Sequence, residues 1–181
     1  MARRRGRVSD PVESYARDVV EGRIVTGRWV RLACERHLRD LTTATMRGLR
    51  WDLDAAMHAI GFYGFLRHSK GRWKGAVVQL EPWQQFRVGC VFGWKRWDEE
   101  LGEWVRRFRT AYNEVARKAG KSTEAAGVGL YLFDADGEGG PEIYCAATMR
   151  DQAKIVWSEA ARMGHAVAGV DQADHHARFP R

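Results

Sequence analysis

The stretch 107–123 constrains the fold more than any other part of the chain. A β-prone run, 108–115, leads into Gly120-Lys121-Ser122, and an alanine-containing segment that favours a helix follows directly. Strand, loop and helix in this order form the context in which backbone N–H groups and a helix N-terminus surround phosphates. In such a loop Lys121 would reach the β- and γ-phosphates, and the Ser122 hydroxyl would bind Mg²⁺. The sequence therefore predicts a site for ATP and Mg²⁺.

The loop departs from the usual phosphate-loop pattern. That pattern opens with a glycine five residues before the second glycine, and here Val115 stands at that position. Because Gly-Lys-Ser alone is a weak signal, an incidental tripeptide stays open as an alternative. The context favours the phosphate loop, since a second strand, 142–148, and a second helix, 149–163, follow at about one βαβ unit. This order implies a parallel sheet with right-handed crossovers.

The loop also carries a family resemblance. Residues 115–122 resemble the deviant Walker A loop of phage large terminase subunits, the ATPases that package DNA into tailed-phage heads. Those loops often lack the first glycine and carry an arginine where Arg117 stands. Four other segments resemble the family in its own order: 15–22, 80–84, 92–94 and 146–153. The resemblance covers roughly residues 12–163 and is specific as a set.

The resemblance implies a fold, partners and a location. It implies an α/β fold of the P-loop NTPase type, with a partial parallel sheet, a helical lead-in and a β-hairpin. The partners it implies are double-stranded DNA, a portal protein and a small terminase subunit. A protein of a phage or prophage with these partners would work in the host cytoplasm.

The resemblance also assigns roles to individual residues. The loop residues expected at the nucleotide are Arg117, Lys118, Ala119, Gly120, Lys121, Ser122 and Thr123. Arg117 would stabilise charge on the transferred phosphoryl group, as an arginine finger does, or would make a plain phosphate contact or a surface ion pair. Gln84, with Gln85 as the alternative, would read adenine, because an amide donates and accepts at once. Thr148 and Gln152 are further candidates near the nucleotide and the DNA path.

We expect three parts along the chain. Residues 1–75 form a basic helical lead-in after a disordered segment 1–9. Its helices run from Asp10, a good N-cap before proline, to about 22, then over about 29–41 and about 52–66. Residues 76–163 form a partial ATPase core, in which an acidic turn with Gly102 joins the two arms of a hairpin within 92–108. Residues 164–181 form a disordered or aberrant tail.

The charge is unevenly distributed. The 181 residues have a net charge of +7, and residues 1–50 hold 12 arginines, no lysine and six acidic residues. Such a segment suits a polyanion, and a merely solvated basic face is the alternative. No apolar run approaches the roughly 18 residues of a membrane span. The three scattered cysteines indicate reduced thiols in a cytosolic protein.

Hydrolysis needs more than a phosphate site. A Walker B aspartate usually binds Mg²⁺ as well, and another residue orients the attacking water. In the resembled family an apolar strand ending in Asp-Glu supplies these groups later in the chain, and a nuclease domain follows. Neither is found in this sequence, and Asp174-His175-His176 reads as a polar tail rather than a metal site. We therefore expect an N-terminal ATPase fragment that binds nucleotide weakly and does not hydrolyse ATP alone.

Two other interpretations stay open at this point. One is a fragment of a helicase-like or kinase-like P-loop protein, because the later motifs that separate these classes are missing. The other is a basic DNA-binding module in which Gly-Lys-Ser is incidental.

Overall fold

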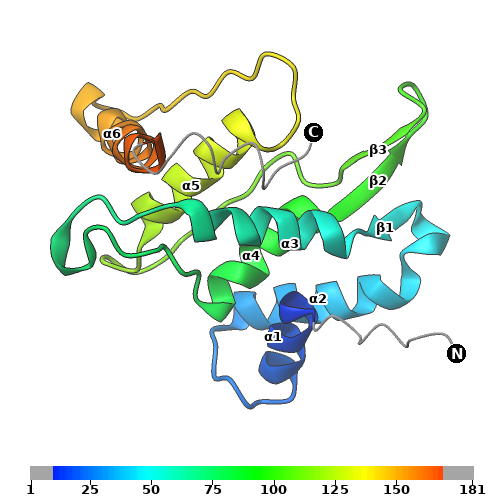
Figure 1. Ribbon diagram of the computed structural model, residues 1–181. Coiled ribbons are helices and arrows are strands. Elements are labelled where there is room, and N and C mark those ends of the chain that lie inside the picture. Colours follow the sequence, from blue (N-terminus) through cyan, green and yellow to red (C-terminus); the bar gives the residue numbers. More distant parts are fainter. Residues whose placement is uncertain (1–9, 169–181) are drawn as a thin grey trace, which may run out of the picture. The chain divides into compact units, whose positions relative to one another are not determined.

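The computed structural model describes residues 10–168 (Figure 1). The segment 1–9 and the residues 169–181, with the Asp-His-His of the tail, lie outside the described residues. The described chain divides into two compact units that alternate along the sequence. The first contains residues 10–58 and 80–111, and the second contains residues 59–79 and 112–168. The expected parts 1–75, 76–163 and 164–181 stay a prediction.

The first unit begins with helix α1, Pro11–Val20. Asp10 caps it as predicted, because its carboxylate accepts hydrogen bonds from the N–H groups of Val12 at 2.8 Å and Glu13 at 3.1 Å. Helix α2, Arg28–Thr43, and helix α4, Pro82–Gly93, pack against α1. The buried stripe of α1 closes the core between these three helices; it consists of Val12, Tyr15, Ala16 and Val19.

The first unit also contains a three-stranded antiparallel sheet in the order β1-β2-β3. Strand β1, Leu49–Trp51, follows the short 3-10 helix η1, Thr45–Arg47, and pairs with β2, Trp94–Asp98. Strand β3, Glu103–Arg106, completes the expected hairpin, with Gly102 in its turn at a φ of 67°. The hairpin prediction is confirmed, because an acidic turn between aromatic runs is a signal that acts over a few residues.

The second unit is mainly helical. Helix α3, Leu53–Phe62, starts in the first unit and ends in the second, where the 3-10 helix η2, Tyr63–Phe65, follows it. A short loop folds back on itself through the bridge between Arg67 and Val77, with the 3-10 helix η3, Gly71–Trp73, at its tip. Helices α5, Lys121–Asp134, and α6, Arg150–Ala168, then pack side by side (Figure 1).

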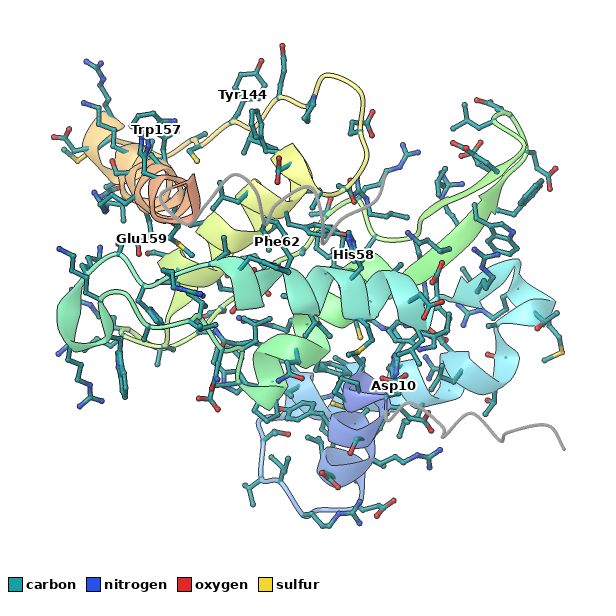
Figure 2. The ribbon with its side chains drawn as sticks, in the orientation of Figure 1. Asp10, His58, Phe62, Tyr144, Trp157 and Glu159 are labelled. Carbon is teal, nitrogen blue, oxygen red and sulfur yellow. The ribbon has the colours of Figure 1, made fainter. Side chains whose placement is uncertain are left out.

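The α/β class is confirmed, but the described residues do not form the expected parallel sheet. Residues 111–116 and 141–147 belong to no helix or strand, so the expected strands 108–115 and 142–148 are not formed. Tyr112 is 86% exposed and Tyr144 is 81% exposed, and Figure 2 shows Tyr144 on the irregular segment before α6. A strand is stabilised by its neighbour, and within the described residues these two segments have no neighbouring strand.

Among residues 10–168, no helix combines the length and the apolar character that crossing a membrane requires.

Candidate nucleotide-binding site

The predicted phosphate loop is a tight turn in the second unit. The Ala119 N–H donates to the Ala116 carbonyl at 3.3 Å, which closes the turn directly before α5. Lys118, at a φ of 67°, and Gly120, at a φ of 77°, both have left-handed backbone conformations. A lysine there costs about 1–2 kcal/mol, whereas glycine adopts this conformation freely. Left-handed and right-handed residues in succession turn their N–H groups to one side, which makes a concavity for an anion.

The N-terminus of α5 adds further N–H donors to this turn. Its N-cap is Gly120, which offers no side-chain acceptor. The hydrogen bond from the Glu124 N–H to the Gly120 carbonyl, at 2.9 Å, starts the helical pattern. The N–H groups of residues 121–123 therefore have no acceptor within the helix. They point along the helix axis at the positive end of its dipole.

The exposed charged side chains around this N-terminus are cationic, and the acidic residue of the first turn, Glu124, is buried. Arg117, Lys118 and Lys121 are exposed, while Ser122 and Thr123 are partly buried. Cations at the positive end of a helix are disfavoured by about 0.3–1 kcal/mol each. A bound phosphate would reverse that repulsion and accept hydrogen bonds from the free N–H groups. The residues present therefore fit a polyphosphate, with the Ser122 hydroxyl as a candidate Mg²⁺ ligand.

Tyr63 fixes the first turns of α5. Its hydroxyl donates to the Glu124 carbonyl at 2.7 Å in a buried position. A Cβ at Gly127 would lie 2.3 Å from the Tyr63 ring, so only glycine allows this approach. Phe62 adds an edge-to-face contact with Tyr131 at 5.5 Å between ring centroids. The sequence showed the glycine in the helix but gave no sign that its neighbour is Tyr63, 64 positions earlier.

Thr148 and Gln152 lie together in the second unit. The Thr148 hydroxyl donates to the side-chain oxygen of Gln152 at 3.2 Å. Both are exposed at the start of α6, where the Met149 carbonyl accepts hydrogen bonds from the N–H groups of Gln152 and Ala153. Their proposed proximity to the nucleotide stays a prediction.

Gln84, the candidate for adenine, belongs to the first unit and takes part in a helix cap. Its side-chain oxygen accepts from the Glu81 N–H at 2.9 Å, and Glu81 completes a capping box at the start of α4. Gln85 donates from its side-chain amide to the Leu80 carbonyl at 2.8 Å. Proline followed two residues later by glutamine is therefore also a helix-start signal here. The adenine role of Gln84 stays a prediction.

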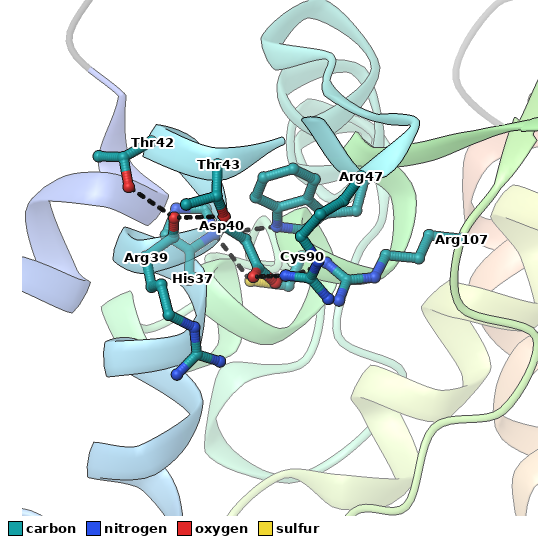
Figure 3. A network of polar contacts seen from close by, with 9 residues as sticks. His37, Arg39, Asp40, Thr42, Thr43, Arg47, Cys90 and Arg107 are labelled. Atoms are coloured by element: carbon teal, nitrogen blue, oxygen red, sulfur yellow. Dashed lines mark hydrogen bonds and ion pairs between the residues drawn. The ribbon is translucent and has the colours of Figure 1, made fainter. Parts of the chain in front are cut away.

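A buried polar cluster in the first unit was not predicted from the sequence (Figure 3). The Asp40 carboxylate, with 0% of its surface exposed, receives hydrogen bonds from Arg47 at 2.5 Å and from Arg107 at 2.7 Å. Burial alone would raise the pKa of Asp40, but the hydrogen bonds and charges of Arg107 and Arg47 outweigh burial and lower it. Arg107 thus ties the start of the stretch 107–123 to α2.

His37 lies beside this cluster and is buried in the core of the first unit. Its Nδ1 accepts a hydrogen bond from the Trp94 indole N–H at 3.0 Å and lies 3.7 Å from the Cys90 sulfur. The ring stands edge-on to Trp51 at 4.9 Å between centroids. Burial lowers the pKa of His37 to about 4, so the side chain is neutral at pH 7. These contacts are those of a packed core rather than of a reaction centre.

Among the described residues, no group of three or more His, Cys, Asp or Glu side chains is placed to hold a metal ion.

Comparison with known proteins adds one finding to this geometry. Residues 82–167 match the family described as terminase large subunit, ATPase domain. The match begins at α4, includes the whole phosphate loop and α5, and ends in the last turn of α6. The resemblance inferred from the sequence is confirmed over this segment. No curated protein and no solved structure matches the chain.

Proposed function

Because residues 82–167 match the family described as terminase large subunit, ATPase domain, we propose that the chain supplies the ATP-binding part of a viral DNA-packaging motor. One observation carries the nucleotide site: three cations surround a helix N-terminus whose N–H groups have no acceptor in the helix. The family match favours this function over a helicase-like ATPase or a DNA-binding module with an incidental tripeptide.

The residues of the loop would divide the work between them. Lys121 holds the β- and γ-phosphates together with the free N–H groups of 121–123, and Ser122 ligates Mg²⁺. Arg117, exposed at the turn, neutralises charge on the γ-phosphate or on the phosphoryl group in transfer. Gln84 reads adenine, and Thr148 with Gln152 senses the nucleotide at the start of α6.

The segments 111–116 and 141–147 would complete the nucleotide domain as strands of a parallel sheet. Each leads directly into a functional element, because 111–116 precedes the phosphate loop and 141–147 precedes α6. Their exposed tyrosines and unpaired backbone suit strand addition. The Walker B strand that hydrolysis needs is not found in this sequence, so these 181 residues would bind ATP without hydrolysing it. Duplex DNA, a portal protein and a small terminase subunit are the proposed partners, in the host cytoplasm.

Calorimetric titration of Mg-ATP into the purified chain tests the nucleotide site. Lys121→Ala should weaken binding about tenfold to a hundredfold, because a hydrogen bond to a charged group contributes about 1.5–3 kcal/mol. Lys154→Ala is the matched control, since Lys154 is an exposed lysine of the same unit. It should leave the affinity within about twofold. Equal affinities of wild-type chain and Lys121→Ala would show that Gly-Lys-Ser is incidental.

A further inference from the structure

The loop that precedes α4 is a small, ordered hairpin, here called the basic hairpin and defined as residues 66–78. The Val78 N–H donates to the Leu66 carbonyl at 3.0 Å, and the His68 N–H donates to the Ala76 carbonyl at 2.9 Å. The Gly75 N–H donates a hydrogen bond to the His68 carbonyl at 2.9 Å. Gly71, at a φ of 72°, and Gly75, at a φ of 84°, allow the reversals at the tip. The tip therefore has a defined shape.

The basic hairpin carries only positive charge. Its cations are Arg67, Lys70, Arg72 and Lys74, and it contains no Asp or Glu. Within the described part of the chain, Lys70 is its one cation that pairs with a carboxylate. Trp73, at the tip, is 57% exposed, and the Arg72 guanidinium lies over its ring at 4.8 Å. The tip therefore presents an aromatic ring between two exposed cations.

A buried carboxylate anchors this hairpin to α6. Glu159 is only 2% exposed, and Figure 2 marks its position on α6. It accepts a hydrogen bond from the Ser69 hydroxyl at 2.8 Å and pairs with Lys70 at 3.2 Å. Arg162, one turn along α6, pairs with the same carboxylate at 3.2 Å. Glu159 thus neutralises Lys70 at the base of the hairpin, while Arg72 and Lys74 at the tip have no carboxylate partner among the described residues.

We propose that the basic hairpin binds the backbone of duplex DNA, with Arg72 and Lys74 on phosphates and Trp73 against a sugar or base. Cations interleaved with an exposed aromatic ring are the groups that contact nucleic acids. The tip is a protruding loop, whereas sites for small anionic ligands are concave. The choice of DNA as the polyanion rests on the proposed function.

The first unit offers a matched comparison for this surface. Arg28 lies over Trp29 at 5.3 Å, and Trp29 is 76% exposed, so the same pair of residue types occurs there. That pair stands at the start of α2, where Arg31 already pairs with Glu35 at 3.0 Å. Replacing the exposed residues Arg28 and Arg39 by alanine removes the same amount of positive charge as replacing Arg72 and Lys74.

The test measures the binding of the full chain to a labelled duplex of about 30 base pairs by fluorescence anisotropy, over a range of salt concentrations. Arg72→Ala with Lys74→Ala should weaken binding about tenfold and reduce the magnitude of the salt slope by about 2. Trp73→Ala should weaken binding about fivefold, because stacking on a base or sugar is lost. Arg28→Ala with Arg39→Ala should stay within about twofold of wild type.

Several results would overturn the proposal. Equal losses of DNA affinity in the Arg72→Ala, Lys74→Ala variant and in the Arg28→Ala, Arg39→Ala variant would show a general effect of charge rather than binding at the hairpin. Binding of a single strand but not of the duplex would contradict the duplex assignment. Hairpin-dependent binding to vesicles of phosphatidylcholine and phosphatidylserine, without DNA binding, would assign the hairpin to a membrane surface. Thermal melts of every variant confirm that these losses do not come from unfolding.

Mg-ATP titration of the same samples separates this proposal from the nucleotide site. Arg72→Ala with Lys74→Ala should keep wild-type ATP affinity, and Lys121→Ala should keep wild-type DNA affinity. A chain that binds ATP but not DNA would overturn the hairpin proposal alone. A chain that binds DNA through the hairpin but not ATP would overturn the nucleotide site alone.

Discussion

The two units of the chain place their cations differently. In the first, Arg107 is largely buried and donates to Asp40, a carboxylate with 0% exposure. In the second, Arg117, ten positions later, is exposed beside a helix N-terminus, and Arg72 is exposed at a hairpin tip. A buried arginine paired with a carboxylate contributes to one defined fold, whereas cations without carboxylate partners remain available to an anion. From this comparison we expect Arg107 to stabilise the fold of the first unit, and we propose that Arg117 and Arg72 of the second unit contact an anion.

Removing the charge of Asp40 should have the largest effect on stability. Asp40→Asn leaves the Arg107 guanidinium, which is 16% exposed, without its anion. The free energy of unfolding should fall by about 3 kcal/mol, because breaking a buried pair from one side leaves a charge uncompensated. Chemical denaturation measures this loss. Glu35→Gln is the control, since its pair with Arg31 is exposed and contributes less than about 1 kcal/mol. A similar loss from both variants would remove the distinction between the units.

Stability should also depend on pH through His37. Its pKa is about 4 in the folded chain against 6.5 for the free side chain, because burial disfavours the charged form. The unfolded state therefore binds the proton first, and stability falls as the pH drops from about 6.5 to 4. The loss reaches about 3.5 kcal/mol at most, from about 1.4 kcal/mol per pKa unit. Asp40 and Glu159, whose pKa values are lowered, lose their contributions as the pH falls through and below their ordinary pKa values of 3.8 and 4.5, so they add to the loss only at the acidic end of this range.

Denaturation at a series of pH values measures the effect of His37. His37→Asn keeps an oxygen acceptor near the place of Nδ1 for the Trp94 indole, but it does not titrate. The variant should be less stable at pH 7 and should show a flat profile between about pH 6.5 and 5, above the range in which Asp40 and Glu159 take up protons. An unchanged slope in the variant would mean that another group senses the pH.

Features set by neighbouring residues were predictable, and features set by distant ones were not. Asp10 before proline gave the start of α1, because capping acts within one helical turn. The start of α5 directly after Gly120 was predictable from a similarly local signal, whereas the role of Gly120-Lys121-Ser122 at a nucleotide stays a prediction. The contact of Asp40 with Arg107 joins residues 67 positions apart, and no local pattern encodes it. The segment 142–148 has β-prone residues, yet a strand also needs a neighbour, which no single segment can provide.

The smallest expected effect on stability is at Glu159, and it links the second unit's fold to its binding surface. Glu159→Gln keeps the shape and an acceptor for the Ser69 hydroxyl but removes the charge that Lys70 and Arg162 share. Both cations are more than a third exposed, so the global free energy of unfolding should fall by only about 1 kcal/mol.

The local effect should be larger, because the carboxylate is the link between the basic hairpin and α6. Hydrogen exchange of the His68, Gly75 and Val78 amides, which hold the hairpin closed, should accelerate before that of α5. Glu138→Gln, at an exposed position of the same unit, should leave these amides unchanged. Uniform acceleration over the whole unit would mean that Glu159 supports the core in general, and that the hairpin is not held separately by it.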